Sequence, residues 1–205
     1  MIVELVIVVK LGGSVASNVK GILSVLQSLG EDILIIPGGW VFAELVRKLD
    51  VRDDEAHWMA ILAVEQYGYY ISSFGIKTIK PRDFDGIEFN GIRVLLPYRL
   101  LINHNELPHS WDVTSDSIAI WIASKLKADR VIKLTNVDGI ILNGKLVNRI
   151  QASKLIGIQT CLDKFAPKLM VKHGIDTFIC NGFFADRVKD YITKGRAKGT
   201  LVEGR

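Results

Sequence analysis

The sequence is poor in cysteine and proline and has no low-complexity tract. It holds two cysteines, Cys161 and Cys180, and five prolines in 205 residues. Neither cysteine stands in a spacing typical of metal ligands, so we expect buried thiols in a reducing compartment and no metal held by the protein. Because no Pro-rich or Gly/Ser-rich linker divides the chain, its length favours a single domain over residues 1–205.

Long apolar runs are also missing. The mean hydropathy is +0.26, but no stretch reaches the roughly 18 consecutive apolar residues that a membrane-spanning helix needs. The first run, Met1–Val9, contains Glu4 and lacks a basic lead, which is untypical of a signal peptide. The sequence therefore predicts a cytoplasmic protein that does not bind a membrane.

A strong excess of one charge is absent as well. The chain has 26 Lys and Arg against 22 Asp and Glu, which gives a net charge of +4. Basic residues concentrate near the end, but no aromatic-rich basic strip or nucleic-acid-binding motif accompanies them, so nucleic acid is not an expected partner. A mildly basic surface also suits small polyanionic ligands.

Apolar strand-like runs alternate with helical segments along the chain. The expected strands are Val3–Leu11, Ile33–Ile36, Ile76–Ile79, Ile92–Leu95, Arg130–Leu134, Thr177–Cys180 and Gly199–Val202. The expected helices are Ser14–Leu29, Gly39–Leu49, Asp53–Ser73, Thr114–Leu126, Ala152–Ile156, Asp163–His173 and Phe184–Thr193. Asn143-Gly144 marks a hairpin tip. This alternation predicts an α/β fold, a three-layer αβα sandwich with a mostly parallel central sheet, whose ligands bind at the carboxyl ends of the strands.

Glycine-rich segments follow the first two expected strands. Lys10 precedes Gly12, Gly13 and Ser14, and the pair Gly38-Gly39 follows the second strand. Glycines let backbone N–H groups approach an anion closely, and the helix start beyond them supplies partial positive charge. Neither segment is a P-loop or a three-glycine dinucleotide fingerprint. Phosphate binding is therefore one interpretation, and a pair of ordinary strand-to-helix turns is the other.

The starts of two expected helices, Thr114–Leu126 and Asp163–His173, carry charged residues that helix capping explains only in part. Asp112 or Thr114 could cap one of these helices, but Asp116 lies inside its first turn, where capping explains it less well. Lys168 stands beside Pro167 early in a later helix, where its charge opposes the helix dipole. A surface position is the ordinary explanation for such a lysine, and a bound anion is the other.

The ordered set of motifs resembles the amino-acid kinase family. The matching segments are Lys10-x-Gly12-Gly13-Ser14, Pro37-Gly38-Gly39, Ser115-Asp116, Val137-Asp138-Gly139-Ile140 and Pro167-Lys168-Leu169. The family commonly has a third glycine in the second glycine loop, whereas this chain has Trp40. The departure puts the shape of the acceptor site in doubt, although not the fold.

This resemblance implies a kinase that uses ATP and Mg²⁺ and transfers the γ-phosphoryl directly to a small anionic substrate. Lys10 and Lys168 would contact the transferring phosphoryl, and Asp116 would orient both lysines through ion pairs. The implied ATP-binding residues are Lys10, Gly12, Gly13, Ser14, Thr135, Asp138, Gly139 and Lys168. The implied acceptor-binding residues are Gly38, Gly39, His109, Asp112 and Ser115. For His109, a structural hydrogen bond is the alternative to acceptor contact.

Three further segments are more distinctive than the family motifs. His57–Ile61, His109–Ser117 and Asn181–Val188 resemble one branch of the family, in which the acceptor is a phosphate monoester and the product a diphosphate. With a second pKa near 6, such an acceptor is already an ionised nucleophile at neutral pH and needs no general base. The alternatives are uridylate, isopentenyl phosphate or acetylglutamate as acceptor, or a non-catalytic nucleotide or oxyanion binder of the same fold.

Family members are usually dimers or larger, so the resemblance also implies a homo-oligomer. The apolar stretches Ala60–Ile71 and Ile118–Ile122 are candidate interface helices. They could equally pack on the sheet.

Overall fold

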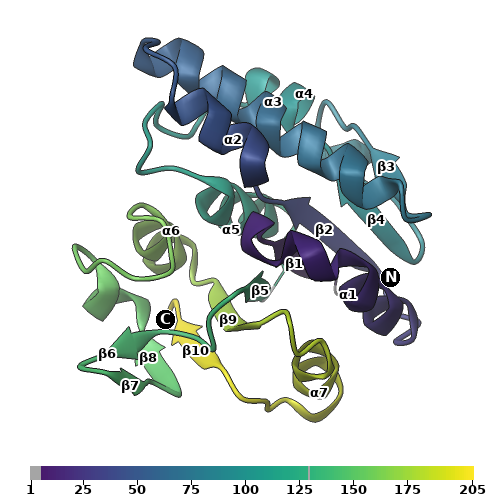
Figure 1. Ribbon diagram of the computed structural model, residues 1–205, viewed down its shortest axis with the longest axis vertical. Helices are drawn as coiled ribbons and strands as arrows, with labels where there is room; N and C mark the ends of the chain where they lie inside the picture. The colour runs from purple at the N-terminus through teal and green to yellow at the C-terminus, as the bar shows by residue number, and fades with distance from the viewer. Residues whose placement is uncertain (1–5, 129) are drawn as a thin grey trace.

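The computed structural model describes residues 6–128 and 130–205, and an eight-stranded sheet forms its centre (Figure 1). The strands are β1 (Ile7–Leu11), β2 (Ile33–Pro37), β3 (Lys77–Ile79), β4 (Ile92–Leu95), β5 (Arg130–Thr135), β8 (Arg149–Gln151), β9 (Asp176–Asn181) and β10 (Thr200–Glu203). Their order is β3-β4-β2-β1-β5-β9-β10-β8. Among the described strands of this sheet, β9 and β10 are the antiparallel pair and the other neighbours run parallel, which confirms the mostly parallel sheet. The part of the first expected strand at residues 3–5 lies outside the described residues.

The helices agree with the expected positions, with a few corrections. They are the 3₁₀ segments η1 (Gly13–Asn18), η2 (Phe84–Gly86) and η3 (Ala152–Leu155) and the α-helices α1 (Val19–Gln27), α2 (Trp40–Arg47), α3 (Asp53–Ser72), α4 (Tyr98–Asn103), α5 (Ser115–Lys125), α6 (Ala166–His173) and α7 (Asp186–Lys194). The single helix expected over Ser14–Leu29 begins with 3₁₀ geometry. The helix expected at Ala152–Ile156 is wholly 3₁₀. Helix α4 and strand β8 were not predicted, because both are short.

Side chains on β1 alternate between two apolar cores, because successive residues of a strand point to opposite faces. Val8 packs with α5 and α6 on one face, and Val9 packs with α1 and α7 on the other. These two helical layers confirm the αβα sandwich. Figure 1 shows α2 lying along the long helix α3 at one end of the molecule.

Of the two apolar stretches considered as interface helices, one is now excluded. Every residue of Ile118–Ile122 is buried in the core, so α5 packs on the sheet. Helix α3 divides its apolar residues, since Ile61 and Tyr67 are buried while Leu62 and Tyr69 are exposed. Among the described residues, no helix combines the length and the apolar composition required to cross a bilayer.

The predicted hairpin tip is confirmed. Strands β6 (Ile141–Leu142) and β7 (Lys145–Leu146) pair in antiparallel fashion around Asn143 and Gly144. Both tip residues have positive φ, 50° and 74°. Two consecutive positive φ angles are what a two-residue hairpin turn requires, and Asn-Gly adopts them readily.

Thr177 on β9 and Thr200 on the neighbouring strand β10 are both buried, but we expect replacement by valine to change the free energy of unfolding in opposite directions. In the described part of the chain, the hydroxyl of Thr177 has no hydrogen-bond partner. The hydroxyl of Thr200 accepts from the Ile140 N–H at 2.8 Å and donates to the Val147 carbonyl. We expect Thr177→Val to raise the free energy of unfolding by about 1 kcal/mol and Thr200→Val to lower it by roughly 1–3 kcal/mol, because an unpaired buried polar group is costly.

Urea denaturation of the two variants beside the wild type measures both shifts. Equal destabilisation by the two substitutions would contradict this assignment of hydrogen bonds.

Candidate active site

The two glycine turns lie against each other. Strands β1 and β2 are parallel neighbours, so their carboxyl ends meet at one edge of the sheet. The Gly38 N–H donates to the Leu11 carbonyl at 2.8 Å. A Cβ at Gly13 would lie 2.4 Å from the Cα of Trp40, so any side chain at Gly13 would push the two turns apart.

Gly12 contacts the neighbouring strand β5 through its backbone. Its N–H donates to the Leu134 carbonyl at 3.0 Å, so this group is used within the protein and is not free for a phosphate. A Cβ at this position would lie 2.8 Å from the same carbonyl oxygen. Gly12 lines the cleft described below, and its contact with ATP stays a prediction.

Trp40 adopts the backbone conformation that a third glycine would favour. Its φ is 47°, in the left-handed region, which costs a non-glycine residue about 1 kcal/mol or more. The indole ring packs against Phe42, Tyr67 and Tyr70, with ring centroids 4.8–5.6 Å away. Burial in this aromatic cluster offsets the strain. The tryptophan thus keeps the turn that glycine would form.

A buried carboxylate between two lysines lies directly beside these turns. Asp116, in the first turn of α5, pairs through Oδ1 with Lys10 Nζ at 2.9 Å and through Oδ2 with Lys133 Nζ at 2.5 Å. All three residues are at most 8% exposed. Lys133 also donates to the Cys161 carbonyl. The pair of Asp116 with Lys10 was expected, but the second lysine is Lys133 and not Lys168.

The parallel register explains why two lysines meet one carboxylate. Lys10 on β1 lies opposite Lys133 on β5, so both side chains leave the sheet on the same face. Helix α5 packs on that face and brings Asp116 to both. In the sequence, Lys133 interrupts the otherwise apolar run Val131–Leu134, and that interruption was the signal for it.

Electrostatics in the cluster favour an anionic ligand. Burial alone would raise the pKa of Asp116, but the charges of Lys10 and Lys133 outweigh it and hold this pKa well below its ordinary value. Burial lowers the pKa of Lys10, and the attraction of Asp116 opposes that change. Two cations share one anion, so the cluster retains positive charge facing the cleft.

Asp163, which sequence reasoning missed, fixes the neighbouring helix starts. Its carboxylate accepts hydrogen bonds from the backbone N–H groups of Thr114 and Ser117, each at 2.9 Å, and of Ala166 at 2.8 Å. It also accepts one hydrogen bond from the side-chain hydroxyl of Thr114 and one from that of Ser117. Its own N–H donates to Asp116 Oδ2 at 3.1 Å. One carboxylate therefore caps α5 and α6 together, and Thr114 does not supply the cap itself.

Lys168 lies exposed in the first turn of α6. Its Nζ is 6.0 Å from the centre of the Phe165 ring. Asp163 and Lys164, just before this helix, line the same cleft as Lys10. The catalytic role of Lys168 stays a prediction from the family resemblance.

A cleft of about 960 Å³ opens over the lysines and the glycine turns. Ser14 and Thr135 both line it, and their hydroxyl oxygens are 3.3 Å apart. Asp112 also lines it and pairs with Lys164 at 2.9 Å. The cleft thus gathers polar groups from β1, β5 and the two capped helix starts.

Asp138 and Gly139, expected at the nucleoside, make their observed contacts with the C-terminal part of the chain. Asp138 pairs with Arg187 at 2.5 Å and with Lys198 at 2.6 Å. Hydrogen bonds from Lys198 and Arg187 lower the pKa of Asp138 to about 2. A Cβ at Gly139 would lie 2.3 Å from the hydroxyl of Thr200. Their contact with a nucleoside stays a prediction.

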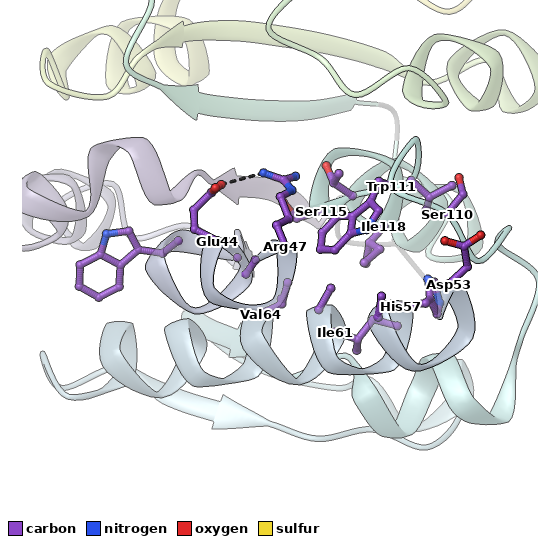
Figure 2. A pocket seen from close by; sticks show the side chains of 17 residues that line it. Glu44, Arg47, Asp53, His57, Ile61, Val64, Ser110, Trp111, Ser115 and Ile118 are labelled. Atoms are coloured by element: carbon purple, nitrogen blue, oxygen red, sulfur yellow. Dashed lines mark hydrogen bonds and ion pairs between the residues drawn. The ribbon is translucent and has the colours of Figure 1, made fainter. Parts of the chain in front are cut away.

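A smaller pocket of about 130 Å³ adjoins the cleft between α2, α3 and α5 (Figure 2). Its apolar walls include Val64, Ile61, Ile118 and Trp111. Two of its other lining residues, Gly39 and Ser115, were expected at the acceptor. The residues it shares with the cleft are Trp40, Glu44, Arg47, Trp111 and Thr114.

His109, also expected at the acceptor, holds the chain that covers this pocket. Its Nδ1 lies 2.7 Å from an Asp54 oxygen and its Nε2 lies 2.8 Å from the Asn105 oxygen. The ring stacks on His57 with centroids 4.0 Å apart. These contacts attach the segment before Trp111 to α3, so the structural hydrogen bond describes His109 better than acceptor contact does.

A parallel sheet with glycine turns and paired buried lysines at its carboxyl edge is typical of α/β proteins that bind phosphate groups. The sequence profile of the Amino acid kinase family matches residues 6–181, and the chain belongs to this family. Its relatives and the family confirm the expected class of enzyme, a phosphotransferase of the kinase type.

Two relatives align over most of the chain. It is 33% identical over 199 residues to the [5-(aminomethyl)furan-3-yl]methyl phosphate kinase of Methanocaldococcus jannaschii, covering 90% of this chain and 92% of that protein. It is 23% identical over 223 residues to the uridylate kinase of Archaeoglobus fulgidus, covering 96% and 99%. The solved structures share the fold at lower identity. The UMP kinase of Ureaplasma parvum has a TM-score of 0.71 at 15% identity, covering 98% of this chain and 99% of its own.

The position of Lys133 in the ion-pair cluster predicts that removal of its charge lowers the activity strongly. We expect Lys133→Met to lower kcat by at least tenfold, because the cluster loses half of its positive charge at the site where phosphate charge must be stabilised. The exposed Lys145, in the β6–β7 hairpin, gives the matched control Lys145→Met, which should leave kcat unchanged.

Steady-state kinetics with Mg-ATP measure the effect, and thermal melting shows the fraction folded, since breaking a buried ion pair also destabilises a protein. A folded Lys133→Met protein with wild-type kcat would exclude Lys133 from the site.

Proposed function

We propose that this kinase phosphorylates [5-(aminomethyl)furan-3-yl]methyl phosphate to its diphosphate with Mg-ATP, as a step of methanofuran biosynthesis. The observation that carries the proposal is the size and place of the pocket beside the lysine cluster. A cavity of roughly 150 Å³ accommodates one benzene-sized ring. The pocket of about 130 Å³ therefore suits a single small ring, whereas a uracil ring in it would leave its ribose to occupy the adjoining cleft.

The arrangement of charges supports the same acceptor. A ring in the pocket would contact Trp111, and its phosphate would reach the shared edge with the cleft, beside Trp40 and Arg47. That phosphate would then lie on the side of the two glycine turns. Arg47 already stacks over the Trp111 ring at 4.7 Å, which holds its guanidinium at this edge.

The reaction needs positioning and charge stabilisation more than proton transfer. An oxygen of the acceptor phosphate forms a bond to the γ-phosphorus while the bond from that phosphorus to the β,γ-bridging oxygen breaks, and ADP leaves. Lys10 and Lys133 would stabilise the charge that develops on the transferring group, and Asp116 would hold both in place. The acceptor is ionised near neutral pH, so no side chain has to remove a proton.

ATP, Mg²⁺ and a homo-oligomer stay predictions of the family resemblance. The carboxylates nearest the cleft fit a metal that is bound mainly by the phosphates of ATP, since Asp116 and Asp163 are already occupied by ammonium, N–H and hydroxyl donors. When bound, Mg²⁺ supplies charge neutralisation between the β- and γ-phosphates.

An acceptor panel tests the proposal. ADP release with Mg-ATP is measured for the furan phosphate, uridylate, isopentenyl phosphate and acetylglutamate. We expect the highest kcat/KM for the furan phosphate, because its ring matches the pocket. Good turnover of uridylate without turnover of the furan phosphate would reject the proposal. Nucleotide binding without turnover of any acceptor would favour the non-catalytic alternative.

Lys168 gives a second prediction. We expect Lys168→Ala to lower kcat by more than tenfold with little change in the Kd of ATP, because the family resemblance assigns Lys168 to the transferring phosphoryl group. Lys172, exposed on the next turn of α6, provides the matched control Lys172→Ala. Wild-type kcat in Lys168→Ala would remove this lysine from the catalytic set.

A further inference from the structure

The pocket between α2, α3 and α5 has two chemically different ends. Glu44 and Arg47 lie at the end that it shares with the cleft. Asp53, His57 and Ser110 line the pocket but not the cleft. Figure 2 shows Asp53 and Ser110 together at one end, away from Glu44 and the Arg47 head group. A ligand whose phosphate lies at the cleft therefore points its other end toward Asp53.

The far end carries one negative charge, on the exposed Asp53, that no other described side chain pairs with. In the part of the chain that the structure describes, no hydrogen bond or ion pair engages the Asp53 carboxylate. Its neighbours in the first turn of α3 are both paired, Asp54 with His109 at 2.7 Å and Glu55 with Arg52. A helix N-terminus favours all three acids alike. The preference of helix N-termini for acidic residues therefore does not explain why Asp53, and neither Asp54 nor Glu55, lines the pocket.

The other polar groups at this end are neutral. Burial, with a smaller contribution from His109, lowers the pKa of His57 to about 4, so its imidazole is uncharged at neutral pH. The Ser110 hydroxyl accepts from the Asp112 N–H at 3.1 Å. At the opposite end, the Glu44 carboxylate is paired with Arg47 at 2.7 Å. The electrostatic asymmetry of the pocket thus rests on Asp53.

We propose that Asp53 binds a protonated amine on the end of the acceptor opposite its phosphate. The acceptor proposed above is such a molecule, and it would place its phosphate at the cleft and its ammonium group at Asp53. This inference rests on the proposed function, and it makes Asp53 a specificity-determining residue that contacts substrate but not the reacting atoms. Asp53 is exposed in the free protein, so an acceptor without the amine would displace water from the carboxylate without replacing its hydrogen bonds, which is costly.

The test compares two acceptors, [5-(aminomethyl)furan-3-yl]methyl phosphate and the analogue with methyl in place of aminomethyl. We expect the wild type to bind the amine about tenfold more tightly, as expected of a charge-assisted hydrogen bond. Asp53→Asn should raise KM for the amine by about tenfold with kcat within twofold, and should leave KM for the methyl analogue nearly unchanged. Glu55→Gln, in the same helical turn but outside the pocket, should change neither.

Equal changes of KM for both acceptors in Asp53→Asn would overturn the inference, since they would indicate a structural effect. Unchanged kinetics for both would overturn it as well. Titration calorimetry separates this inference from the proposed function. If neither acceptor is turned over, the proposed function fails, yet a binding preference for the amine that Asp53→Asn abolishes still supports the inference. Equal affinities of the wild type for both compounds would reject it.

Discussion

One buried carboxylate determines the geometry of the whole site. Asp116 binds Lys10 and Lys133, which lie opposite each other on the adjacent strands β1 and β5. Charges buried in this way are costly unless they are paired, so removal of Asp116 would leave two buried lysines without a counter-charge. The same pairing holds two ammonium groups beside the glycine turns, where an incoming phosphate would need them.

The rest of the site depends on keeping Asp116 in that position. Asp163 caps α5 and α6 with one carboxylate and also donates its N–H to Asp116, so the helix starts and the ion pairs form a continuous network. The pKa of Asp163 is raised, mainly because the carboxylate is buried and secondly because the negative charge of Asp116 lies nearby. Asp163 nevertheless accepts five hydrogen bonds, which stabilise its ionised form.

Most of the fold could be predicted from the sequence, because buried parallel strands are continuous apolar runs and helices such as α1 and α2 are amphipathic. The glycine turns and Asp116 were also visible, since each stands just after a strand or at a helix start. Lys133 was harder to find. A lysine within an apolar strand indicates a buried partner, but the register that places it opposite Lys10 depends on long-range pairing. The contacts of His109 with Asp54 and His57 were hard to find for a similar reason, because they join segments far apart in the chain.

The most direct measurement is a crystal structure of the protein with a non-hydrolysable ATP analogue and the furan phosphate. We expect an oxygen of the γ-phosphate within hydrogen-bonding distance of Lys10 Nζ, with the Asp116 pairs intact and the acceptor ring against Trp111. A γ-phosphate bound away from Lys10 and Lys133, with the acceptor outside the pocket, would contradict it.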